Sequence, residues 1–253
     1  MSAFVKSPAD IALLKKSGKI LAKVLAKLKT RVGIGIDLLT LEELAKSLIK
    51  EAGASPAFLG YRPEGARFAY PYAICASLNE AAVHGKPFSY RLKSGDILKL
   101  DLGVDFKGMI TDTAVTIGVG EISREAKRLL RATEKALSEG IKAAKPGRTV
   151  GDIGYAIQKA ARQGKISIIP ALTGHGVGRE LHEDPVIYNY GERGEGERLV
   201  EGMVLAIEPI TCLGSGKIIQ ARDESYVTAD QSLAAHFEHT ILITKKGNEI
   251  LTK

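Results

Sequence analysis

Two segments of this chain are so alike that they constrain its fold more than any other feature. Residues 95–101 (GDILKLD) and 202–208 (GMVLAIE) each combine a glycine turn, a short apolar strand and a final carboxylate. The neighbouring segments correspond in the same order: HGKP at 84–87 with HEDP at 182–185, and DTAVTIG at 112–118 with EHTILIT at 238–244. Two related halves facing a shared site would produce this order. Chance similarity between short apolar strands is the alternative.

Helix signals occur as a similar pair in each half. Ser7-Pro8 is expected to begin the first helix, because Ser side chains cap helix N-termini and Pro suits the first turn, and a second helix should begin near Asp37. These helices should end near Lys29 and at Gly53. In the second half we expect helices from about 123 to 144 and from Thr149 through residue 160, separated by Pro146-Gly147.

Length and composition indicate one compact unit. The chain has 253 residues, 45% of them hydrophobic, which is enough for one sizeable core. We therefore expect a single domain over 1–253, with half-repeats at roughly 8–120 and 121–253. The formal charge of +7 favours weak association with anionic surfaces, ribosomal RNA included.

Cysteine content and the N-terminus bear on the compartment. Cys75 and Cys212 are far apart and belong to no CxxC pattern, so we expect no disulfide and a reducing cytoplasm. The first ten residues do not resemble a signal peptide, and apolar runs stay short of membrane-spanning length. A cytoplasmic protein without a membrane partner is the expectation.

Four carboxylates stand within or beside apolar strands, where an ionised group is costly to bury unless it is paired or bound to a cation. The neighbouring strands offer few cations besides Lys99, whereas a metal cluster would neutralise all of the carboxylates together. These residues are Asp101, Asp112, Glu208 and Glu238.

His175 adds an imidazole in TGHGVGRE, where the flanking glycines leave room for it to approach a ligand. Four carboxylates and one imidazole suit two divalent ions such as Co, Mn, Fe or Zn, with carboxylates as bridges. A closed structural zinc site would be expected to use cysteine and histidine. The residues thus predict a dinuclear metal centre.

The ordered set of Asp101, Asp112, His175, Glu208 and Glu238 resembles the metal ligands of type I methionine aminopeptidases. The resemblance spans nearly the whole chain through SLNEAAVHGKP, KLDLGVDFKGMITDTA, GHGVGRELHEDP, GMVLAIEP and FEHTILIT. It implies an α+β pita-bread fold, in which a pseudo-twofold repeat forms a curved antiparallel sheet flanked by helices. It also implies the minimal bacterial form of the enzyme.

The resemblance assigns roles to these residues. Asp101 would hold one ion, His175 and Glu208 the other, and Asp112 and Glu238 would bridge both. Glu208 would also shuttle a proton, His182 would stabilise the oxyanion, and His84 would contact the substrate backbone. A structural hydrogen-bonding role is the alternative for either histidine.

The implied activity is hydrolysis of the first peptide bond of nascent proteins that begin with methionine and a small second residue. Two cations lower the pKa of bound water, which would supply the nucleophile. The implied partners are the N-terminal methionine of nascent polypeptides and the ribosome, and the implied state is a monomer.

The resemblance is weaker around the substrate side chain. Tyr61, Tyr70 and Cys75 are similar to family residues that line the methionine pocket, and apolar, polarizable walls suit a thioether. The segment YRPEGARFAY is longer than the usual bacterial pattern, Leu181 replaces an aromatic residue, and the chain has no tryptophan.

Two other functions compete with this interpretation. An Xaa-Pro aminopeptidase or prolidase would use the same metal ligands, but such enzymes usually have a further N-terminal domain and an acidic residue where His239 follows Glu238. A non-catalytic pita-bread protein that binds RNA or a partner protein would be expected to have lost metal ligands. All five are present here.

Overall fold

The computed structural model describes residues 5–62 and 67–253 of the chain. Over these residues it contains four helices, at the positions that the capping residues predict: α1 (Pro8–Arg31), α2 (Leu38–Glu51), α3 (Arg124–Ala143) and α4 (Val150–Gln163). Each N-cap side chain accepts a hydrogen bond from a backbone N–H of the first turn, as predicted for Ser7 and Thr149 and as also found for Asp37.

The strands pair in antiparallel fashion in four small sheets. The two larger sheets carry the segments that the sequence repeat marks. The first contains β1 (Ser55–Pro56), β2 (Cys75–Leu78), β4 (Ile97–Phe106) and β5 (Met109–Gly118). The second contains β7 (Thr173–Gly176), β8 (Glu183–Tyr188), β9 (Val204–Ile207), β14 (His239–Thr244) and β15 (Gly247–Ile250).

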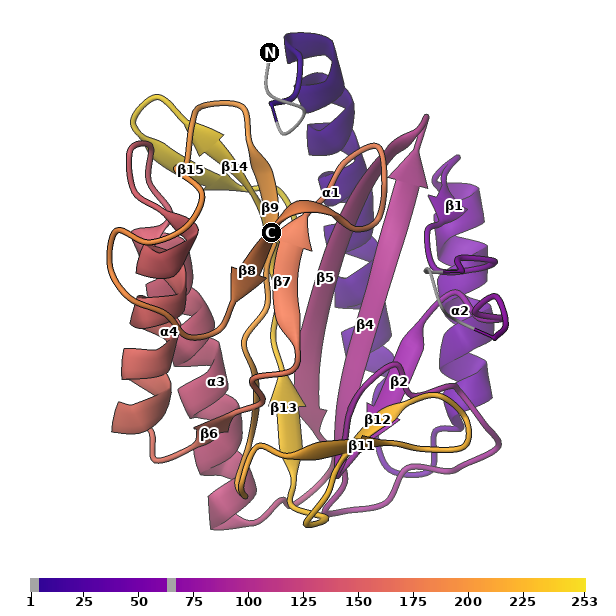
Figure 1. Ribbon diagram of the computed structural model, residues 1–253. Coiled ribbons are helices and arrows are strands. Elements are labelled where there is room, and N and C mark those ends of the chain that lie inside the picture. The colour runs from indigo at the N-terminus through magenta and orange to yellow at the C-terminus, as the bar shows by residue number, and fades with distance from the viewer. Residues whose placement is uncertain (1–4, 63–66) are drawn as a thin grey trace.

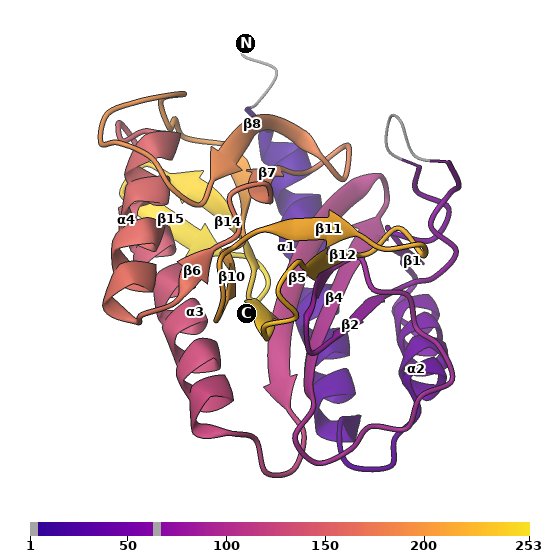
Figure 2. The same ribbon diagram turned by 60° about the horizontal axis from the view of Figure 1, so that its bottom comes forward.

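Two three-stranded sheets complete the arrangement. One contains β6 (Ser167–Ile168), β10 (Ile210–Cys212) and β13 (Ala234–His236), and the other contains β3 (Ala81–Val83), β11 (Ile218–Gln220) and β12 (Tyr226–Thr228). In the latter, β12 pairs with β3 from the opposite half of the sequence. The hairpin of β11 and β12 is thereby attached to the first half of the chain, as Figure 2 shows.

Helices cover the strands on both sides, and each half has its own apolar core. Helices α1 and α2 pack with β4, through residues such as Leu21, Leu41 and Leu100. Helices α3 and α4 pack with β9 and β14, through residues such as Leu137 and Ile157. Figure 1 shows α3 and α4 at the left of the strands, α1 behind β4 and β5, and α2 at the right. This is the predicted α+β arrangement of helices around antiparallel sheets.

The strands of the first half are longer than the sequence indicated. Asp101 was expected to end one strand and Asp112 to begin the next. Instead β4 continues to Phe106 and β5 begins at Met109, so both aspartates lie inside a hairpin of two ten-residue strands. An aspartate inside a strand opposes strand propensity, and the reason that it occurs here is the buried cluster described below.

Threonine side chains join β5 to the opposite half. The N–H of Asp112 donates to Oγ1 of Thr240 at 2.9 Å, and the Thr240 hydroxyl donates to the Asp112 carbonyl at 2.7 Å. Thr116 makes the same pair of bonds with the backbone of His236, at 2.7 and 2.8 Å. Between them, the N–H of Glu238 donates to the Ala114 carbonyl at 2.9 Å. We call these contacts the threonine seam; they fix the two halves in register.

Two further expectations concern the cysteines and the membrane. Cys75 and Cys212 are both buried free thiols, which confirms that they form no disulfide. Among the helices of the described residues, none is both long and apolar enough to cross a membrane.

Candidate active site

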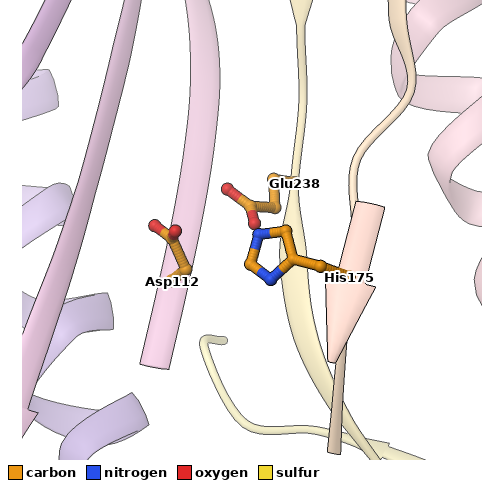
Figure 3. Close-up of side chains that lie close together, drawn as sticks. All are labelled: Asp112, His175 and Glu238. Atoms are coloured by element: carbon orange, nitrogen blue, oxygen red, sulfur yellow. The ribbon is translucent and has the colours of Figure 1, made fainter. Parts of the chain in front are cut away.

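The five predicted metal ligands come from both halves of the molecule. Asp101 lies in β4 and Asp112 in β5, His175 in β7, Glu208 directly after β9, and Glu238 between β13 and β14. One ligand atom each of Asp112, His175 and Glu238 can be chosen so that all three lie within 4.8 Å of one another. Figure 3 shows these three side chains converging from β5, from β7 and from the segment between β13 and β14.

Glu208 joins this group through its carboxylate. Its Oε1 lies 3.4 Å from Nε2 of His175, and its Oε2 lies 3.1 Å from Nε2 of His236. Asp101 belongs to the same group, because it interacts electrostatically with Asp112, Glu208 and Glu238. The fold thus gathers all five residues in one cluster.

Burial and mutual repulsion raise the pKa values of these carboxyl groups. Burial raises the pKa of Asp112 to about 7. Burial, followed by the charges of neighbouring carboxylates, raises the pKa values of Asp101, Glu208 and Glu238 well above their usual range. Burial also lowers the pKa of His175 to about 3, so its imidazole is neutral and can act as a ligand.

The donor set fits divalent metal ions. Oδ1 of Asp101 and Oε1 of Glu238 are buried and have no hydrogen-bond partner among the residues that the structure describes. Buried polar atoms of this kind call for a specific explanation, and a cation that accepts several carboxylate oxygens and one imidazole nitrogen supplies it. Lys99 does not neutralise the cluster, because its ammonium donates to the carbonyls of Asn79 (2.7 Å) and Ala234 (3.2 Å).

His84 and His182 line a cavity of about 620 Å³, together with His175 and Glu208. His84 has a left-handed backbone (φ 59°), a conformation in which histidine is several-fold enriched among non-glycine residues. Gly85 follows it where an added Cβ would lie 2.7 Å from Cα of Ser77, so this turn requires glycine. Burial lowers the pKa of His84 to about 4, and its ring packs edge-on to Tyr226 at 5.8 Å.

His182 stands between the metal cluster and Tyr61. Its ring centroid lies 4.5 Å from that of His175, and its Nδ1 lies 2.7 Å from the hydroxyl of Tyr61. The loop that carries it is fastened by Glu183, whose Oε1 accepts the N–H groups of Arg179 (2.7 Å) and Glu180 (3.1 Å). The other oxygen of Glu183 pairs with the buried ammonium of Lys6, from the segment before α1.

The residues expected to line the side-chain pocket form one small apolar cluster. Cys75 packs with Phe58 and Leu181, and Tyr61 and Tyr70 lie partly buried against them. The Tyr70 hydroxyl donates to the carbonyls of Ile74 (3.0 Å) and Gly85 (3.1 Å), which ties this wall to the turn that carries His84. Of the long segment between the two tyrosines, residues 63–66 lie outside the described part of the chain.

Three residues at the site were missed by the sequence analysis: His236, Tyr226 and Phe58. A signal existed for His236, because it lies two residues before Glu238, and residues two apart in an extended segment point to the same face. Burial lowers the pKa of His236 to about 3. The sequence gives no comparable signal for Tyr226 and Phe58, because their positions depend on how the β11–β12 hairpin and the loop after β1 fold toward the site.

The family comparison covers most of the chain. Residues 12–245 match the model of Metallopeptidase family M24. A methionine aminopeptidase of Clostridium perfringens is 41% identical over 249 residues, which cover 98% of each chain. Methionine aminopeptidase 1 of Bacillus subtilis shows the same identity and coverage.

Solved structures agree with this grouping. The methionine aminopeptidase of Thermotoga maritima superposes with a TM-score of 0.94, at 43% identity and 98% coverage of both chains. A prolidase of Pyrococcus furiosus shares the fold at a TM-score of 0.77 and 25% identity, and the match covers 99% of this chain but 65% of the prolidase. The likeness to the first is greater in TM-score, in identity and in the share of the other chain that is covered.

Proposed function

The chain belongs to the methionine aminopeptidases of metallopeptidase family M24, and from this premise we propose that it removes the initiator methionine from nascent proteins whose second residue is small. It is a hydrolase that uses divalent metal. The observation that carries the finer proposal is the buried group of four carboxylates and one neutral imidazole at the junction of the two halves, beside the small apolar cluster that contains Cys75.

We propose that this group holds two ions. Asp101 would serve one, His175 and Glu208 the other, and Asp112 and Glu238 would be shared. The unpartnered oxygens of Asp101 and Glu238 support this assignment. When bound, such ions lower the pKa of a water molecule and polarise the scissile carbonyl group.

Glu208 is the proposed proton carrier. Burial raises the pKa of Glu208 well above its usual range and so favours the protonated carboxyl group, which would let one oxygen take a proton and later release it to the leaving amine. Its two oxygens lie 3.4 Å from His175 and 3.1 Å from His236, and the residue also lines the cavity, which supports this role.

His182 and His84 are the proposed contacts to the substrate amide. If the Tyr61 hydroxyl donates to Nδ1 of His182, the single proton of the neutral ring resides on Nε2, where it can donate to the developing oxyanion. His84 would bind the backbone of the substrate near the same bond, and its left-handed backbone directs the ring into the cavity wall.

The apolar cluster around Cys75 is the proposed pocket for the methionine side chain. Phe58, Leu181 and the faces of Tyr61 and Tyr70 would surround the thioether, and sulfur–aromatic contacts favour it over a branched aliphatic chain.

We also propose that the protein acts as a monomer in the cytoplasm and associates weakly with ribosomes, an interaction that the +7 charge supports. Cosedimentation with ribosomes at increasing salt tests this part. Association that does not weaken with salt would contradict an electrostatic origin.

An activity assay tests the proposed reaction. The chelated protein is given Co, Mn, Fe or Zn separately and assayed on the peptides Met-Ala-Ser, Met-Leu and Ala-Pro. We expect release of methionine from Met-Ala-Ser, with Met-Leu much slower and Ala-Pro intact. Hydrolysis of Ala-Pro without hydrolysis of Met-Ala-Ser would favour a prolidase-like enzyme, and no hydrolysis with any metal would favour a non-catalytic protein.

A further inference from the structure

His236 is a buried histidine at the site to which the proposed reaction gives no role. The side chain is 2% exposed, and neither ring nitrogen has a hydrogen-bond partner among residues 5–62 and 67–253. A buried donor without an acceptor costs about 1–3 kcal/mol. We therefore expect the buried His236 ring to interact with a neighbouring polar group.

The backbone of His236 is held firmly in place. The Thr116 hydroxyl donates to the His236 carbonyl at 2.7 Å and accepts from the His236 N–H at 2.8 Å, as part of the threonine seam. The position of the ring is therefore set by β5 on one side and by the segment leading to Glu238 on the other. It is a fixed point from which a mobile side chain can be oriented.

The group within reach is Glu208. Nε2 of His236 lies 3.1 Å from Oε2 of Glu208, whereas Oε1 of the same carboxylate lies 3.4 Å from Nε2 of His175. The two oxygens thus face different histidines. One of these, His175, is a proposed metal ligand, and the other, His236, is not.

We propose that His236 is a positioning residue for Glu208, whose Nε2–H holds Oε2 and so keeps Oε1 turned toward the metal donors. The inference rests on the proposed function, because it concerns the carboxylate that would both bind metal and carry a proton. A neutral imidazole has one N–H, and placing it on Nε2 leaves at Nδ1 only an acceptor. A small rotation of either side chain aligns the two atoms.

A donor at Oε2 would make the two oxygens of Glu208 distinct, although the same carboxylate would both bind metal and carry a proton. Rotation about the terminal bond of a free glutamate exchanges its oxygens, because that torsion is broad and nearly two-fold. A donor on one oxygen removes the exchange. Groups that orient metal ligands in this way change metal affinity or activity by about 10–100-fold when they are replaced.

The test compares H236A and H236Q with the wild-type protein. H236A removes the donor, whereas the amide of H236Q can still donate to Oε2. H239Q is the matched control, because Nδ1 of His239 lies 2.9 Å from Oγ1 of Thr252, away from Glu208. Titration calorimetry of each chelated protein with Mn²⁺ measures affinity and stoichiometry, and kcat and KM are measured on Met-Ala-Ser.

We expect H236A to bind Mn²⁺ about 10–100-fold more weakly and to lose kcat with little change in KM, since the ring does not line the substrate cavity. H236Q should recover most of both losses, and H239Q should resemble the wild type. Far-UV circular dichroism and unfolding midpoints of the metal-free proteins check that the variants fold.

Two results would overturn the assignment. Wild-type affinity and kcat in H236A would show that Glu208 needs no such partner. A loss in H236Q equal to that in H236A, with one metal equivalent missing, would make the ring a ligand rather than a positioning residue. If wild-type protein binds Mn²⁺ but leaves Met-Ala-Ser intact, the proposed function fails while the calorimetric comparison still decides the role of His236.

Discussion

The threonine seam predicts that one hydroxyl group carries a measurable share of the stability of this protein. Thr240 is fully buried, and its Oγ1 satisfies both the N–H and the carbonyl of Asp112. The substitution Thr240→Val keeps the shape of the side chain and removes both bonds. Because Asp112 faces the opposite half at this point, its two backbone groups would be left buried without partners.

The expected cost follows from those two groups. A buried polar group that loses its partner costs about 1–3 kcal/mol, so T240V should lower the free energy of unfolding by about 3 kcal/mol. For a chain of this size that corresponds to a fall in Tm of about 6–12 °C. T113V removes one bond to the Glu238 carbonyl (2.7 Å) and should cost about 1 kcal/mol.

Urea unfolding followed by far-UV circular dichroism, with chelator present throughout, measures these differences. The control is T30V, because the Thr30 hydroxyl donates to the Lys27 carbonyl at an exposed helix end, where water can replace it. If T240V unfolds within about 0.5 kcal/mol of T30V, the reasoning is refuted, because surface substitutions already vary by that amount.

Three further predictions concern the site. E208Q should lower kcat on Met-Ala-Ser at least about 100-fold in steady-state assays, since it removes a proposed ligand and proton carrier; near-normal turnover would exclude that role. K6M should lower the free energy of unfolding by about 3 kcal/mol in urea titrations, because Glu183 loses its buried partner. D10N, which breaks the more exposed ion pair between Asp10 and Arg179, should lower it by under about 1 kcal/mol. Burial raises the pKa of Asp112 to about 7, so Mn²⁺ uptake should release more protons at pH 6 than at pH 8 in calorimetry with different buffers, and equal release would contradict it.

The same raised pKa gives the metal-free protein a direction of pH dependence. A carboxyl group whose pKa is higher in the folded than in the unfolded chain stabilises the fold most below its unfolded value, about 4, and loses that contribution as the pH rises through 7. The contribution of Asp112 to stability should therefore decline between those limits in the presence of chelator.

The helices were predictable because their signals are local. Ser7, Asp37 and Thr149 each accept a hydrogen bond from the first turn of the helix that they precede. Burial along α2 is less easily predicted, because Leu41 is buried whereas Leu44 and Leu48 are only partly covered. Which residues of an amphipathic helix are covered depends on the crossing angle with its neighbours, and that angle is not a local property.

The strands and the site show where a single sequence stops being informative. The carboxylates were recognisable because charge in an apolar strand needs a cause, yet the same charge led to β4 being predicted too short at Asp101. Lys99 was the cation nearest in sequence, but its ammonium binds two backbone carbonyls instead. Its partner at residue 234 is distant in sequence, so the contact arises only when the two halves close.

The clustering of donors from both halves also has a consequence for the amount of folded protein in a cell. A ligand that binds only the folded chain stabilises it by about 2.7 kcal/mol when its free concentration is a hundred times its Kd. Ions held between β4 and β5 on one side and β7, β9 and β14 on the other would act as a reversible cross-link whose strength depends on supply. Metal starvation would then raise the population of opened chains available to proteases, so that the abundance of this protein, as well as its turnover number, would follow the metal content of its surroundings.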